Sequence, residues 1–182
     1  LKRRYDALDM RERKTRTRRH SFTATGALID DVRGELRFFR ERAEGGDLNL
    51  ADWDRYAITA DPAGSGASSP DQQKGDPACA YVWDRANNEQ IAEWHGYMDP
   101  DEFGRTLTHI GSLYGQPTIV AEAGPWGGHV ISILQRLGYP RIYFRENLDD
   151  QLLAPTTHFG QYGWLTSPKT KPQMIDALRQ MW

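Results

Sequence analysis

The spacing of hydrophobic and polar positions changes along the chain and separates predicted strands from predicted helices. From about residue 53 onward, the first apolar residues form short runs bounded by turn residues, which is typical of strands. The turn at 84–88 joins two of these runs into a hairpin. The three strands expected here cover residues 55–60, 79–83 and 89–97.

Beyond the hairpin, helical and strand patterns alternate. Asp99 followed by Pro100 is typical of a helix start, and apolar residues then recur at helical spacing as far as Gly115. The run 117–121 is almost entirely apolar, as expected for a strand covered on both faces. The remaining elements are expected as a helix over 127–137, a strand over 141–145, and a last helix that Ser167-Pro168 opens and in which Met174, Ile175 and Leu178 face inward.

This order of elements predicts an α/β fold built on a mixed five-stranded sheet flanked by helices. Three antiparallel strands come first and two parallel strands follow, which is the ribonuclease H-like order. In that order the first and fourth strands lie side by side and run in the same direction. Their carboxyl ends are therefore expected to be neighbours.

The first fifty residues differ from the rest in charge and pattern. Residues 1–20 have a helical, strongly basic pattern, and residues 27–42 mix apolar and charged positions around Gly34, which indicates two short elements. The basic run favours a polyanionic partner such as DNA, although a solvated helix face explains it equally well. A glycine-rich turn at 44–47 suggests a boundary between a basic segment and linker, 1–50, and a domain over 51–182.

Composition narrows the class of protein. The 182 residues carry a net charge of -2, and the single Cys79 excludes an internal disulfide and a cysteine-based zinc site. We expect Cys79 to be a buried, inert thiol. No run approaches the roughly 18 to 20 apolar residues that cross a bilayer, and no signal peptide is found, so a soluble cytoplasmic protein is expected. The chain starts at Leu1 and stops at Trp182 inside a helical pattern, which suggests a fragment of a longer polypeptide truncated at its C-terminus.

Two of the expected strands end in a carboxylate. Asp61 follows the run 56–60 and Glu122 follows the run 118–121, and both are followed by turns rich in glycine and proline. Oxygen ligands at neighbouring strand ends suit Mg²⁺ or Mn²⁺, and two such ions promote phosphodiester hydrolysis. Each residue also has a purely structural explanation, namely a turn-forming Asp before Pro62 and a solvated charge at a strand end.

An ordered series of short segments resembles the nuclease domain of phage large terminase subunits. Residues 56–63 carry the first part of this resemblance, followed by Gly75-Asp76 and by 80–85. The likeness extends in order from about residue 52 to the end of the chain. Its other segments are 89–96, 99–103, 120–122, 128–130, 137–143, 163–167, 169–172 and 175–178.

The resemblance implies a metal-dependent endonuclease that cuts concatemeric double-stranded viral DNA during genome packaging in the host cytoplasm. It places the catalytic, metal-binding acids at Asp61 and Glu122, with Asp76 as a further metal-proximal acid and Mg²⁺ or Mn²⁺ as cofactor. It also implies that the full-length protein has an ATPase domain, a portal and a small terminase subunit as partners. Residues 1–50 would then include the tail of that ATPase domain.

This chain departs from the family pattern in two ways. Residues 123–126 replace a stretch where family members often have Asn. The family's third catalytic Asp is expected beyond Trp182, and Asp176 is better explained as a solvated helix residue. No phosphate-binding loop motif is found in the chain.

Two other functions remain open on the sequence alone. One is a non-catalytic DNA-binding or docking module, and the other is a different ribonuclease H-like nuclease of the resolvase or integrase type. Several further side chains are secondary candidates near the site, although packing or solvation explains each of them as well. These are His129, His158, Lys169 and Lys171, with Trp126, Tyr162 and Trp164 as candidate base-stacking residues.

Overall fold

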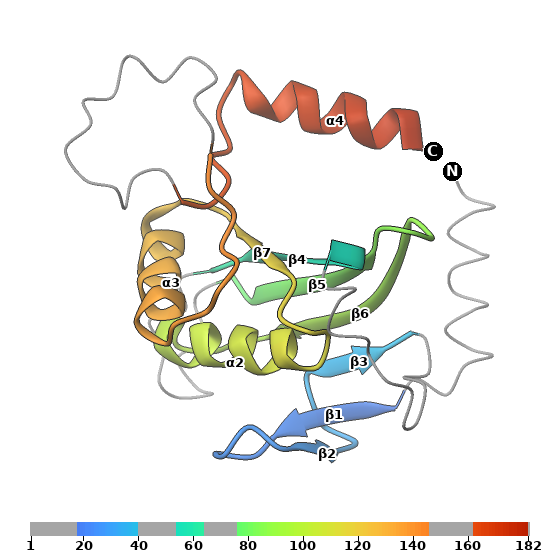
Figure 1. The fold of residues 1–182 in the computed structure, drawn as a ribbon, viewed down its shortest axis with the longest axis vertical. Helices are drawn as coiled ribbons and strands as arrows, with labels where there is room; N and C mark the ends of the chain where they lie inside the picture. Colours follow the sequence, from blue (N-terminus) through green and yellow to red (C-terminus); the bar gives the residue numbers. More distant parts are fainter. Residues whose placement is uncertain (1–17, 40–53, 64–75, 146–161, 182) are drawn as a thin grey trace.

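The computed structural model describes residues 18–39, 54–63, 76–145 and 162–181, and a seven-stranded mixed sheet is its main feature (Figure 1). The strand order is β2-β1-β3-β6-β5-β4-β7. The strands are β1 (Arg19–Phe22), β2 (Leu28–Asp30), β3 (Leu36–Phe38), β4 (Tyr56–Asp61), β5 (Ala78–Asp84), β6 (Glu89–Gly96) and β7 (Thr118–Ala121). The helices are α2 (Pro100–Ser112), α3 (Pro125–Arg136) and α4 (Thr170–Met181).

The three strands expected from residue 55 onward are confirmed as β4, β5 and β6, which pair antiparallel. The hairpin turn between β5 and β6 is built around Asp84, whose side chain is 1% exposed. This carboxylate accepts hydrogen bonds from Arg55 and from the backbone of Ala86 and Asn87. The predicted turn at 84–88 therefore forms because a buried acid satisfies its amide groups.

The parallel pairing that the sequence predicts is also confirmed. β7 lies beside β4 and runs in the same direction, with Ala57 opposite Thr118 and Ala60 opposite Ala121. The carboxyl ends of these two strands therefore lie next to each other.

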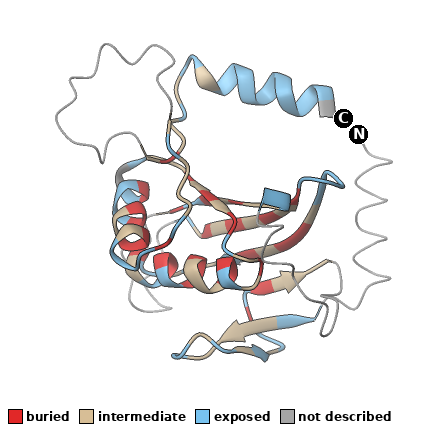
Figure 2. Cartoon of the chain, viewed as in Figure 1, coloured by how far each residue is buried: buried red, intermediate tan, exposed pale blue. Residues whose placement is uncertain are grey.

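The helices α2 and α3 cover one face of the sheet and form the core with it (Figures 1 and 2). Asp99 caps α2 as expected, because its side chain accepts a hydrogen bond from the Asp101 amide at 2.8 Å. The two helices approach closely at Gly104, where a β-carbon would lie 2.7 Å from Cγ2 of Ile133. The largest fully buried side chains include Phe103, Leu107, Ile110, Ile133 and Leu134.

The number of strands differs from the prediction: the sheet has seven strands rather than five. Three of them, β1 to β3, come from residues 19–38, which the sequence analysis assigned to a basic segment and linker. They belong to the same sheet because β3 pairs with β6, with Leu36 opposite Trp94. Residues 19 and 20 are thus in a strand and not in the expected helix, and residues 1–17 lie outside the described part.

The expected fifth strand over 141–145 does not form a ladder of its own. Ile142 makes an isolated parallel bridge with Ile119, and Phe144 makes an antiparallel bridge with Tyr162. The segment contacts two different partners through single residue pairs, which is why no regular strand is found there.

The last helix, α4, forms close to its predicted start but is not packed as predicted. The hydroxyl of Ser167 accepts a hydrogen bond from the Thr170 amide at 3.1 Å, which caps the helix. Met174, Ile175 and Leu178 were expected to face inward, yet they are 46%, 41% and 53% exposed. Figure 2 shows α4 exposed along its length, because no described element covers its apolar side.

None of the helices in the described residues combines the length and the apolar character that crossing a membrane requires.

Candidate active site

Asp61 and Glu122 meet at the carboxyl ends of β4 and β7. Asp61 is the last residue of β4, and Glu122 is the first residue after β7. The backbone amide of Glu122 donates a hydrogen bond of 2.9 Å to the carbonyl of Ala60, which continues the parallel ladder by one residue. The two side-chain carboxyl groups lie within hydrogen-bonding reach of each other. The structure therefore brings together the two acids that the sequence analysis singled out.

The surroundings raise the pKa of Asp61 above its ordinary value of 3.8. Partial burial is the largest cause, and the negative charge of Glu122 and a hydrogen bond to it come next. All three effects disfavour the ionised form of Asp61. A cation between the two carboxylates would reverse this, because it would compensate the charge that each acid imposes on the other.

Asp76 lies close enough to act on the same acid. It is exposed, it precedes β5, and its charge is the weakest of the four influences that raise the pKa of Asp61. Among the described residues, no three Asp, Glu, His or Cys side chains are close enough together to hold a metal ion. The described geometry is therefore a carboxylate pair with a third negative charge at longer range.

The start of α3 packs directly on the backbone of Glu122. A β-carbon on Gly127 would overlap the carbonyl oxygen of Glu122, so only glycine permits this approach. The N-cap of α3 is Gly124, which provides no side-chain hydrogen bond, and the first turn contains no acidic residue. The positive end of the helix is therefore not neutralised by its own side chains next to Glu122.

Residues 162–164 hold Glu122 from the other side, although they lie far away in the sequence. The amide of Trp164 donates to the Ala121 carbonyl at 2.7 Å, and the amide of Ala123 donates to the Trp164 carbonyl at 2.6 Å. Gly163 has a φ of 81°, and a β-carbon there would lie 2.7 Å from the Ala121 carbonyl oxygen. Sequence reasoning missed this contact, because no local pattern links positions so far apart.

Cys79 lies opposite Asp61 in the β4–β5 ladder. It is half-buried rather than fully buried, which corrects the expectation from its apolar neighbours. Burial raises the pKa of the Cys79 thiol, although a hydrogen bond with Tyr81 acts in the opposite direction. Burial also raises the pKa of Tyr81 to about 12. Both groups are therefore protonated at neutral pH, and Cys79 is not an activated nucleophile.

Some of the secondary candidates contact other described side chains, and others are exposed. His129 pairs with Asp101 at 2.5 Å and so joins α3 to α2. Trp164 lies beside Tyr143, with ring centroids 6.3 Å apart. Tyr162 lies beside Phe144 at 5.1 Å. Trp126, in contrast, is 47% exposed. Lys171 is exposed near the start of α4, Lys169 is exposed just before that helix, and His158 lies outside the described residues.

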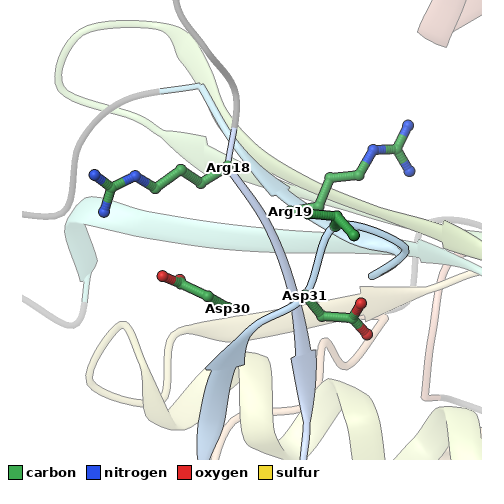
Figure 3. A pocket seen from close by; sticks show the side chains of 5 residues that line it. Arg18, Arg19, Asp30 and Asp31 are labelled. Atoms are coloured by element: carbon green, nitrogen blue, oxygen red, sulfur yellow. The ribbon is translucent and has the colours of Figure 1, made fainter.

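A separate hollow lies at the opposite edge of the sheet, between β1 and β2. It has a volume of about 350 Å³ and is lined by Arg18, Arg19, Asp30, Asp31 and Val32. Figure 3 shows the two arginines, Arg18 and Arg19, above the two aspartates, Asp30 and Asp31. Asp31 is already engaged, because it accepts hydrogen bonds from Ser21 at 2.5 Å and from the Arg33 amide at 2.9 Å. Four strands separate β1 from β7 in the sheet order, so this hollow is not part of the Asp61–Glu122 site.

Comparisons with known proteins find similarity to solved structures. No protein-family model matches the chain, and no curated protein matches it. Among solved structures, the chain is similar to the large terminase nuclease from thermophilic phage G20c with bound magnesium, at 13% sequence identity and a TM-score of 0.48. The match covers 81% of this chain and 60% of that chain.

Proposed function

We propose that this chain has a ribonuclease H-like fold and is the metal-dependent endonuclease domain of a viral large terminase, which cuts concatemeric double-stranded DNA during packaging. The observation that carries the proposal is the contact between Asp61 and Glu122 at the ends of two parallel strands. The ordered sequence resemblance to terminase nucleases supports the same substrate.

The donor groups at this site fit Mg²⁺ or Mn²⁺. Carboxylate oxygens are the ligands that these hard cations prefer. Partial burial and then the negative charge of Glu122 raise the pKa of Asp61, and a cation bound between the two carboxylates would offset that charge. Asp61 and Glu122 would hold the metal, and Asp76 would add negative charge from the side. When bound, such a cation supplies Lewis-acid stabilisation of the charge that develops on the phosphate oxygens.

The chain's own residues have distinct tasks in this proposal. Asp61 has to lose its proton to bind a cation, so deprotonation and metal binding are coupled. Glu122 is fixed in place by Gly127 on one side and by Trp164 on the other. Both acids lie at the carboxyl ends of β-strands that are paired to each other. Their separation is therefore set by the sheet and not by a flexible loop.

A plasmid-cleavage assay with Mg²⁺ or Mn²⁺ tests this function. Asp61→Asn and Glu122→Gln are each expected to reduce cleavage by at least about a hundredfold, because each removes a charged ligand. Asp176→Asn is the matched control and is expected to cleave as the unaltered chain does. Asp176 is an exposed acid on α4 that pairs with Arg179 at 3.2 Å. Circular dichroism spectra of all variants verify that they are folded.

The outcomes also separate the other functions. Cleavage that survives Asp61→Asn would overturn the proposed metal role. DNA binding without cleavage by the full-length protein would favour a non-catalytic DNA-binding or docking module. A strong preference for branched over linear DNA would favour a nuclease of the resolvase or integrase type.

A further inference from the structure

The first turn of α3 presents an exposed tryptophan next to the proposed active site. Trp126 is 47% exposed and follows Glu122 by four positions. In the described part of the chain, its indole side chain makes no ring contact and no hydrogen bond. The other aromatic residues near Glu122 differ in this respect, because Trp164 contacts Tyr143 and Tyr162 contacts Phe144. Packing accounts for those rings but not for Trp126.

The backbone holds Trp126 at a fixed position relative to Glu122. Its neighbour Gly127 packs directly against the Glu122 carbonyl, so the first turn of α3 cannot move away from the strand end without losing that contact. Gly124 and Gly128 flank the ring in the sequence, and a β-carbon at either position would meet nothing within 4 Å. Among the described residues, nothing therefore fills the space beside these two glycines at the start of α3.

We propose that Trp126 stacks on an unpaired nucleobase of the DNA strand that enters the Asp61–Glu122 site, an inference that rests on the proposed nuclease function. An exposed indole ring offers a flat surface that accepts any base, because every base has a π-face. The first turn of α3 contains no acidic residue that would repel the neighbouring phosphates. A base can stack on this ring only when it is not paired, so the contact favours DNA opened next to the phosphate to be cut.

A binding assay in EDTA tests the contact without any dependence on cleavage. The unaltered full chain is titrated with a duplex, with the same duplex containing an unpaired bubble, and with a single strand, by fluorescence anisotropy. Trp126→Ala is expected to weaken binding of bubble and single-strand DNA by roughly 5- to 100-fold, which corresponds to the loss of one stacked base. Trp126→Phe is expected to retain most of the affinity. Leu137→Ala is the matched control, because Leu137 is 40% exposed at the other end of α3.

A 2-aminopurine base in the bubble provides a second readout. Its fluorescence is expected to fall when the unaltered chain binds, because stacking quenches it, and to stay high with Trp126→Ala. The unfolding temperature of each variant separates a stacking role from a structural one. Because the Trp126 ring is exposed, Trp126→Ala is expected to weaken DNA binding without lowering the unfolding temperature.

Three results would overturn the proposal. The first is equal affinity of Trp126→Ala and the unaltered chain for bubble DNA. The second is an equal loss of affinity for bubble and fully paired DNA, which would indicate a contact with the backbone instead of a base. The third is an unaltered chain that binds no DNA, with Trp126 serving a protein partner instead. Failure of the nuclease proposal gives a different result. In that case Asp61→Asn would still cleave DNA, while binding of bubble DNA in EDTA would still depend on Trp126.

Discussion

The amide of Glu122 donates a hydrogen bond of 2.9 Å to the carbonyl of Ala60, and this bond places Glu122 beside Asp61. The bond is one more step in the parallel ladder between β4 and β7, so the two acids meet because their strands do. Whatever keeps this ladder in register also keeps the site together.

The first prediction concerns the charge of the pair. Because the folded chain holds the Asp61 proton more tightly than the unfolded chain, ionisation of Asp61 costs stability as the pH rises above 3.8 toward its raised pKa. Asp61→Asn is therefore expected to unfold at a higher temperature than the unaltered chain at neutral pH in EDTA. Asp61 is partly desolvated by its neighbours but its side chain is still exposed to solvent, so we expect a gain of at most about 1 kcal/mol, or roughly 2 to 4 °C.

The same gain is expected to disappear below about pH 3, where Asp61 is protonated in both states. Added Mn²⁺ is expected to raise the unfolding temperature of the unaltered chain and not that of Asp61→Asn. A variant that is less stable than the unaltered chain at neutral pH in EDTA would contradict the repulsion between Asp61 and Glu122.

The second prediction concerns two adjacent glycines in α3. Gly127→Ala places a β-carbon on the Glu122 carbonyl oxygen and forces α3 away from β7, whereas Gly128→Ala points into open space. We expect Gly127→Ala to lower plasmid cleavage by about tenfold or more and to lower the unfolding temperature. Gly128→Ala is expected to cleave normally and to gain up to about 1 kcal/mol in stability, because alanine is the better helix former. Equal behaviour of the two variants would show that close packing on Glu122 is unimportant.

The third prediction concerns Asp84, the buried acid that builds the hairpin turn. Hydrogen bonds from Arg55, at 2.8 and 3.2 Å, are the main reason that its pKa is lowered to about 2. Asp84→Ala is expected to cost about 3 kcal/mol in a denaturant titration, because it removes a buried carboxylate that pairs with Arg55 and leaves turn amides without an acceptor. Asp54→Ala is the control: Asp54 pairs with Arg85 on the surface, and its loss is expected to cost less than about 1 kcal/mol.

The pH dependence of this contribution has the opposite sign to that of Asp61. A lowered pKa means that the stability from Asp84 is complete above pH 3.8 and is lost as the pH falls toward about 2. The difference in unfolding free energy between Asp84→Ala and the unaltered chain should therefore narrow over that range. A constant difference down to pH 2 would indicate that Asp84 acts through packing and not through its charge.

Local pattern was enough to predict the elements that carry the site. The hydrophobic positions in β4, β5, α2 and β7 follow a clear strand or helix spacing. The same pattern places the two acids at strand ends. Contacts between distant segments could not be predicted in this way. The pairing of Trp164 with Glu122 and the exposure of the α4 stripe depend on where those segments lie in space, which no local period specifies. The catalytic and metal-binding roles of Asp61, Glu122 and Asp76 stay predictions until they are tested.

The clearest departure from the sequence-based prediction is the extension of the sheet by β1, β2 and β3, and a matched pair of variants tests it. Leu36 is 1% exposed, lies opposite Trp94 and belongs to the main core. Ile29, in the edge strand β2, is 46% exposed. If residues 19–38 are part of the sheet, Leu36→Ala should lower the free energy of unfolding by about 2 to 4 kcal/mol, whereas Ile29→Ala should cost less than about 1 kcal/mol. A basic linker would give small and similar effects at both positions. Denaturant titrations of the two variants therefore decide whether the first fifty residues serve only as a linker or also supply part of the hydrophobic core under β6.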